Sequence, residues 1–353
     1  MTHNFTYEEI KRQPDTWKQT IDTVLHKRKE FEQLFTAEEP DEVVFIGSGT
    51  SYYISITAAL TFQEQTGIAA KPVPASEIFL KPDAVIAKNK KTLMVAFSRS
   101  GNTTEVVRAI EFVQNNELAT CLAITGNLES DMAQKTAHTI VLPHIQEKSV
   151  VMTGSYTNML LTSQLLAGIV SRDETYLSEL KELPGIGGTI MPQAETMGQK
   201  LGGELEYAHF IYLGLGSYLG LALEGMLKMK EMTQAFAEAF NPLEFRHGPI
   251  SVINEECRVI LMSHRSLQSY EPDVITDVRR LGANTVVIGD DLDGFDSDET
   301  FELGSRLSDQ SRGILYLPLL QWLAYFRTVK MGLNPDKPRN LNQVVVLEDT
   351  KGE

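Results

Sequence analysis

The sequence predicts an α/β fold of two doubly wound parallel-sheet subdomains related by duplication. Short apolar runs alternate with stretches of helical periodicity, which is typical of parallel βαβ units. The expected strands form two groups of four: 43–47, 93–98, 121–125 and 139–143, then 210–214, 258–263, 285–289 and 313–318. The groups share a nearly constant offset, since Gly47 and Gly214 lie 167 positions apart and Leu122 and Val286 lie 164 apart. Two unrelated α/β domains with similar strand spacing are the alternative to duplication.

The expected domain boundaries follow from these groups. An N-terminal helical segment comes first, in which Thr6 and Glu9 form a candidate capping box and Pro14 is expected to separate two helices. The glycine-rich stretch 182–191 is expected to link the two subdomains. The predicted parts are 1–38 (helical segment), 39–185 (first subdomain), 195–340 (second subdomain) and 341–353 (C-terminal tail near the functional site).

The composition is that of an acidic globular protein. Of its 353 residues, 42% are apolar and 22% are charged, and the net charge is −15. This charge repels nucleic acids and anionic membranes, so neither is expected as a partner, and an anionic ligand would need local N–H groups or hydroxyls. The N-terminus has no signal-peptide pattern, no apolar stretch approaches ~18 residues, and Cys121 and Cys257 lie in apolar runs. These features predict a cytoplasmic protein.

Two loops that follow expected strands are rich in glycine and hydroxyl groups. The first contains Ser48, Thr50 and Ser51, and the second contains Ser98, Arg99, Ser100 and Thr103. Both loops precede expected helices, whose N-terminal amides bind anions, and both lie at the carboxyl edge of a parallel sheet. The alternatives are an ordinary strand–helix turn for the first loop and a polar N-cap cluster for the second. Together the loops predict a site for an anionic group.

One expected helix, within 217–240, places three charged residues on one face. Glu224, Lys228 and Glu231 are four and three residues apart, beside apolar positions. A carboxylate next to apolar surface has a raised pKa that suits proton abstraction, whereas a solvated ion-pair ladder is the alternative. His247 follows in a short loop whose glycine and proline fix the backbone direction. No His/Cys pair has metal-ligand spacing, so neither a metal nor another cofactor is expected.

Six segments carry a resemblance to a known family. GSGTSYY (47–53), SRSGNTTE (98–105), EKSVVMTGSYTNM (147–159), ALEGMLKMKE (222–231), EFRHGP (244–249) and DKPRNL (336–341) stand in that family's order. The chain resembles the sugar isomerase (SIS) domain proteins, in particular the isomerase half of glucosamine-6-phosphate synthase and the galactosamine-6-phosphate deaminase/isomerase branch. The resemblance implies two SIS subdomains and a homodimer with active sites at the subunit interface.

The resemblance also assigns roles to residues. Thr50, Ser51, Ser98, Arg99, Ser100 and Thr103 correspond to the sugar-phosphate cradle. Val150 corresponds to a backbone contact with the sugar. Glu231 corresponds to the base that moves hydrogen between C1 and C2, with Lys228 as its charged neighbour. His247 corresponds to a ring-opening histidine supplied by the partner subunit.

Departures from the synthase pattern refine the expected activity. The glutaminase domain is absent from this sequence, and Gln343 stands where the synthase has its imine-forming lysine. Arg99 replaces a glutamine, and its planar donor fork suits a strongly anionic head group. The expected function is therefore aldose–ketose isomerisation of a 6-phosphorylated or 6-sulfo hexose through a cis-enediol. An amino-sugar-phosphate deaminase, a fructosamine-phosphate deglycase and a non-catalytic sugar-phosphate-binding module are the alternatives.

Overall fold

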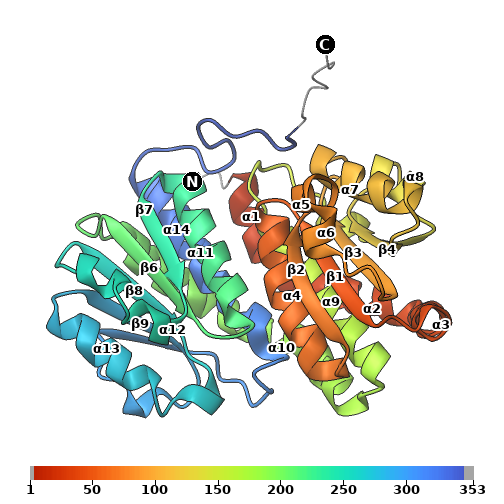
Figure 1. The fold of residues 1–353 in the computed structure, drawn as a ribbon. Helices are drawn as coiled ribbons and strands as arrows, with labels where there is room; N and C mark the ends of the chain where they lie inside the picture. Colours follow the sequence, from red (N-terminus) through yellow and green to blue (C-terminus); the bar gives the residue numbers. More distant parts are fainter. Residues whose placement is uncertain (1–3, 346–353) are drawn as a thin grey trace.

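The computed structural model describes residues 4–345, which form two parallel sheets side by side with helices around them (Figure 1). The first sheet has the strand order β2-β1-β3-β4-β5, and the second has the order β7-β6-β8-β9-β10. The strands are β1 (Glu42–Gly47), β2 (Ala69–Pro74), β3 (Thr92–Ser98), β4 (Thr120–Thr125), β5 (His138–Val141), β6 (His209–Gly214), β7 (Phe236–Phe240), β8 (Cys257–Met262), β9 (Asn284–Gly289) and β10 (Glu299–Glu302). The same order in both parallel sheets confirms the predicted α/β class with a repeated subdomain.

The helices cover both faces of each sheet. They are α1 (Phe5–Lys11), α2 (Gln13–His26), α3 (Arg28–Glu38), α4 (Thr50–Thr66), α5 (Ala75–Leu80), α6 (Pro82–Val85), α7 (Thr104–Asn115), α8 (Asp131–Lys135), α9 (Gly154–Ser171), α10 (Glu174–Gly203), α11 (Tyr218–Thr233), α12 (Pro242–Phe245), α13 (Glu271–Arg280) and α14 (Leu317–Lys330). Alternate residues of β1 enter different cores: Val43 and Phe45 join the large central core, whereas Val44 and Ile46 join an outer one. The central core also contains Tyr212 of the second sheet, so the two halves share it.

Seven of the eight predicted strands are strands, and the eighth is wrong. Residues 313–318 lie in a 3-10 turn (Arg312–Tyr316) and the first residues of α14. A short apolar run that is buried on all sides looks the same in a helix and in a strand. The strands β2, β7 and β10 were not predicted. All three are edge strands, and their partly exposed, charged or proline-containing sequences lack an apolar run.

The N-terminal helices differ from the prediction in one detail. Pro14 lies at the start of α2 and α1 ends at Lys11, as expected. The predicted capping box is wrong, because Asn4 caps α1 by accepting a hydrogen bond from Tyr7 N at 3.2 Å. Thr6 Oγ1 instead donates to Asp336 at 2.8 Å, and Glu9 accepts from Lys148 N at 2.6 Å. Both side chains therefore bind residues that are distant in the sequence and do not cap the helix.

The glycine-rich segment 182–191, which was expected to link the two subdomains, is helical. It lies inside the 30-residue helix α10, which connects the two halves and packs along α14 and α2. Gly187 lies against Trp17 so closely that a Cβ at this position would be 2.3 Å from Trp17 Cζ3. The absence of a side chain at Gly187 therefore permits the close packing of α10 against α2.

Helices α4 and α11 face each other between the sheets and bring the two halves of the site together (Figure 1). Each follows the first strand of its sheet, β1 or β6. Their contact is close at Gly220, where a Cβ would lie 2.2 Å from Thr57 Oγ1, and Thr57 Oγ1 donates to Ser217 O at 2.8 Å. This packing places the first turn of α4 beside the C-terminal half of α11.

Candidate active site

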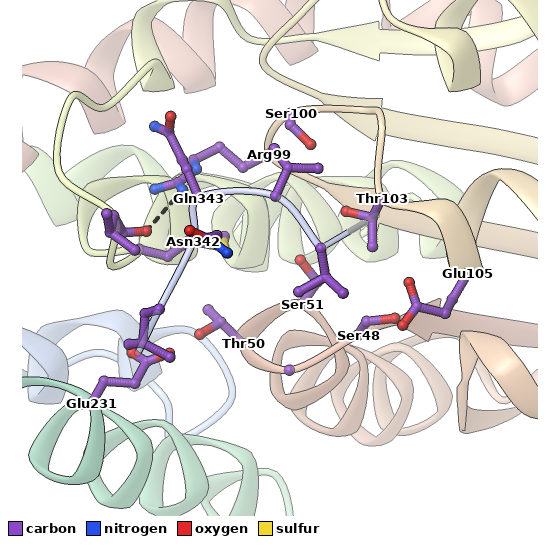
Figure 2. Close-up of a pocket in the computed structure, with 16 residues that line it drawn as sticks. Ser48, Thr50, Ser51, Arg99, Ser100, Thr103, Glu105, Glu231, Asn342 and Gln343 are labelled. Carbon is purple, nitrogen blue, oxygen red and sulfur yellow. Dashed lines mark hydrogen bonds between the residues drawn. The ribbon is translucent and has the colours of Figure 1, made fainter. Parts of the chain in front are cut away.

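A cavity of about 290 Å³ lies at the carboxyl ends of β1 and β3, next to α11 (Figure 2). Six residues of the two predicted anion-binding loops line it: Ser48, Thr50, Ser51, Arg99, Ser100 and Thr103. Val150, Glu231 and Gln343 line it as well, so the fold brings nine of the twelve predicted site residues together. Residues 341–345 of the predicted C-terminal tail also contribute to the wall, and the remainder of that tail lies outside the described residues.

The cradle loops owe their shape to glycine and to internal hydrogen bonds. Gly49 (φ 56°) and Gly101 (φ 70°) adopt left-handed conformations that favour glycine. In the second loop, Ser98 Oγ pairs with Thr103 Oγ1 at 2.9 Å and accepts from Gly101 N at 3.0 Å. Ser98 is buried and shapes the loop without lining the cavity. Within the described part of the chain no side chain caps α4 or α7, so both helix starts are suited to an anion.

The guanidinium of Arg99 is bonded to protein groups. Its Nη1 donates to Glu147 Oε2 at 2.9 Å and to Val151 O at 3.2 Å, and its Nη2 donates to Val150 O at 2.9 Å. Burial alone would raise the pKa of Glu147, but Arg99 and hydrogen bonds from Ser155 outweigh burial and lower it. The two side chains form a buried, charged pair.

The charged face of α11 lies largely in the interior. The side chains of Glu224 and Lys228 are buried, and that of Glu231 is 19% exposed at one end of the cavity (Figure 2). Lys228 Nζ donates to Glu231 and to Thr50 Oγ1, and it lies 3.4 Å from Glu224 Oε1. The alternative of a solvated ion-pair ladder is therefore wrong.

Burial and charge shift the pKa values on this face in opposite ways. Burial raises the pKa of Glu224 to about 8, although Lys228 partly offsets this. Burial disfavours the charged form of Lys228, but the carboxylates of Glu224 and Glu231 outweigh it and raise its pKa. Lys228 is thus a cation at neutral pH, and its ammonium group donates a hydrogen bond to Glu231.

His247 lies apart from this cavity within the chain. It is exposed and sits between α12 and a 3-10 turn at Pro249–Val252. Its expected contribution to the site of a second subunit stays a prediction.

Three carboxylates near the cavity were not predicted from the sequence. Glu105 lines the cavity, and its Oε2 is buried with no hydrogen-bond partner among residues 4–345. Glu147 and Glu9 lie behind the wall and hold the segment 147–151. Glu105 and Glu147 fall within segments that carry the family resemblance, which was the available signal. Their burial depends on tertiary partners that the sequence does not reveal.

Within residues 4–345, no cluster of three or more His, Cys, Asp or Glu side chains is placed to hold a metal ion. None of the helices in this range is both long and apolar enough to cross a membrane.

A family model described as SIS domain matches residues 38–168 and 206–300. The chain belongs to the SIS domain family. Its relatives include the isomerizing glutamine–fructose-6-phosphate aminotransferases of Sulfurisphaera tokodaii (29% identical over 350 residues) and Pseudomonas aeruginosa (27% over 363 residues). The alignments cover 98% of this chain but only 57% and 59% of those proteins, so the SIS chain spans little more than half their length.

Solved structures share the SIS fold over nearly the whole chain. The glucosamine-6-phosphate deaminase of Thermotoga maritima has a TM-score of 0.80 at 28% identity, with 98% of this chain and 100% of that one covered. The tagatose-6-phosphate ketose/aldose isomerase of Escherichia coli has a TM-score of 0.89 at 23% identity, covering 99% and 98%. At 23% identity, the similarity to the E. coli isomerase shows a shared fold.

Proposed function

We propose that this SIS protein is an aldose–ketose isomerase for a hexose with an anionic group at C6, either phosphate or sulfonate. The observation that carries the proposal is a single cavity with Glu231 near Thr50 and the hydroxyls of Ser100 and Thr103 farther along it (Figure 2). A carboxylate and an anion cradle in one cavity suit proton transfer on an anchored sugar.

The cradle would hold the C6 group, and Glu231 would then face the carbons next to the carbonyl. The Glu231 carboxylate takes the proton from C2 of the open-chain aldose, and the C–H electrons form the C1=C2 bond of a cis-enediol as O1 gains a proton. Glu231 returns its proton to C1 while O2 loses one, which gives the ketose. Lys228 donates a hydrogen bond to Glu231, and its fixed positive charge lowers the free-energy cost when the Glu231 carboxyl group gains and loses its proton.

Further features of the proposal come from the resemblance. His247 of the second subunit in a homodimer would open the sugar ring. Gln343 lines the cavity, where its Nε2 donates to Glu147 O at 2.9 Å, and an amide cannot form an imine with the ketose. The proposed reaction therefore passes through an enediol without a covalent enzyme–sugar intermediate. We further propose that the enzyme acts on a free sugar in the cytoplasm.

A second candidate is an amino-sugar-phosphate deaminase, which the likeness to the Thermotoga maritima glucosamine-6-phosphate deaminase favours. Its reaction starts with the same proton transfer at C2 and then expels the amine, so Glu231 would keep its role. The cavity itself fits both reactions.

The two candidates differ in their products. The test incubates the purified protein in D₂O with 6-phospho and 6-sulfo hexoses and amino-hexoses and follows the C1 and C2 label and ammonia by NMR. Deuterium at C1 or C2 with interconversion of aldose and ketose supports the isomerase. Release of ammonia identifies the deaminase. Binding of these sugars without any exchange contradicts both and indicates a sugar-binding module.

A further inference from the structure

We propose that Arg99 is a positioning residue, which acts through Glu147 on the cavity wall and does not bind the ligand's anionic group. The inference rests on the proposed function only in that the cavity is where a ligand binds. It replaces the role that the sequence resemblance gives to Arg99.

The hydrogen bonds of Arg99 are directed at the segment 147–151. Both terminal nitrogens are engaged there: Nη1 by Glu147 Oε2 and Val151 O, and Nη2 by Val150 O. The side chain is 8% exposed, so it touches the cavity with little of its surface. The guanidinium has five N–H donors, and three of them are committed to this buried wall.

The carboxylate of Glu147 neutralises the positive charge of Arg99. Its Oε1 accepts from Thr153 N at 3.0 Å, Thr153 Oγ1 at 2.9 Å and Ser155 N at 3.0 Å, while Oε2 accepts from Arg99 and Ser155 Oγ. These bonds stabilise a carboxylate in the interior, and the resulting pair is neutral as a whole. Removal of Arg99 alone would leave a buried charge without a counter-ion.

The same segment is fastened from two other directions. Glu9 of α1 accepts from Lys148 N and Ser149 Oγ, and Asp336 O accepts from Val150 N at 3.0 Å. The segment carries Val150 into the cavity wall, with Met152 next to it. Arg99 thus forms the link between this wall and the cradle loop.

A consequence concerns the charge of the cavity. Among the described residues that line it, Arg99 is the only cation, and its charge is matched by Glu147. An anion in the cradle would then be held by hydroxyls and by the starts of α4 and α7. This is the kind of binding that the acidic composition of the chain requires.

The test compares Arg99→Gln, Glu147→Gln and the double variant with the wild type. The first readout is hydrogen exchange of residues 147–152 by mass spectrometry, which needs no ligand. We expect exchange to rise roughly 10- to 100-fold in Arg99→Gln, because the buried Glu147 loses its counter-ion, and to return toward the wild-type rate in the double variant. Arg279→Gln, which removes an exposed pair with Asp296, is the control and should leave this segment unchanged. Unchanged exchange in Arg99→Gln would overturn the proposal.

The second readout is binding of inorganic phosphate and of fructose 6-phosphate by calorimetry. Affinity should fall at least about tenfold in Arg99→Gln and recover to within a few-fold of wild type in the double variant. Affinity that stays low in the double variant would mean that Arg99 contacts the anion and would refute the positioning role. If no protein binds either probe, the proposed anion cradle fails, and hydrogen exchange alone decides the role of Arg99.

Discussion

The packing of α10 can be tested with two adjacent glycines. Gly187 faces Trp17, whereas Gly188 is exposed, and a Cβ there would meet nothing within 4 Å. The perturbation is a single added methyl group, Gly187→Ala or Gly188→Ala. Both changes favour the helix by ~1 kcal/mol because alanine loses less backbone entropy than glycine.

The clash with Trp17 decides the difference between the two variants. A Cβ on Gly187 would lie 2.3 Å from Trp17 Cζ3 and 3.0 Å from Cε3. Trp17 cannot move easily, because it is fully buried and its Nε1 donates to Thr157 Oγ1 at 2.8 Å. Overpacking of this kind costs about 1–3 kcal/mol. We expect a cost at the upper end of this range because the Trp17 ring cannot move away. We expect Gly187→Ala to lower the free energy of unfolding by about 1–2 kcal/mol and Gly188→Ala to raise it by about 0.5–1 kcal/mol.

The assay is urea denaturation of both variants and the wild type at one protein concentration. The expected order of stability is Gly188→Ala, then wild type, then Gly187→Ala. If Gly187→Ala is as stable as Gly188→Ala, the close contact between α10 and α2 is refuted, and the segment 182–191 would be better described as the loose linker that its composition suggests.

Two further predictions concern the carboxyl groups of Glu224 and Asp336. Burial raises the pKa of Glu224 from 4.5 to about 8, so the folded chain keeps this proton over a pH range in which the unfolded chain releases it. Wild-type stability should therefore fall with rising pH across this window, relative to Glu224→Gln, by up to about 1.4 kcal/mol per pH unit; parallel stability profiles would contradict this. Asp336 accepts from Phe5 N, Thr6 N and Thr6 Oγ1. Asp336→Ala should expose α1 to hydrogen exchange and destabilise the protein by about 1–2 kcal/mol, with Asp336→Asn in between; equal exchange in all three proteins would refute this link.

The interior strands could be predicted from the sequence because burial on both faces gives an uninterrupted apolar run, as in 43–47. Edge strands such as β7 could not, since partial exposure removes this signal. The turn at 313–318 was mistaken for a strand because its apolar residues are buried by helix packing. Local patterns therefore predicted every inner strand of the described sheets but, of their edge strands, β5 alone.

The cradle loops were predictable because glycine and hydroxyl residues directly after a strand indicate a tight turn with exposed hydrogen-bond donors. The partners of Arg99 were not. Glu147 lies 48 positions away, and only the folded chain places its carboxylate beside the guanidinium. The proximity of Glu224 and Lys228 was expected from their spacing, but the complete burial of the Glu224 side chain was not. Long-range pairing of charges is the part of the site that the sequence could not provide.

The most direct test of the central claim is solvent deuterium exchange by Glu231→Gln, measured with the sugar that turns over in the D₂O panel. Gln keeps the size of the side chain but cannot accept the proton, so we expect label at C1 and C2 to fall by about 10²–10⁴-fold. Calorimetry should show that the same sugar still binds, and Glu182→Gln, at an exposed position of α10, should exchange like the wild type. Exchange by Glu231→Gln within a few-fold of the wild type would show that another group moves the proton.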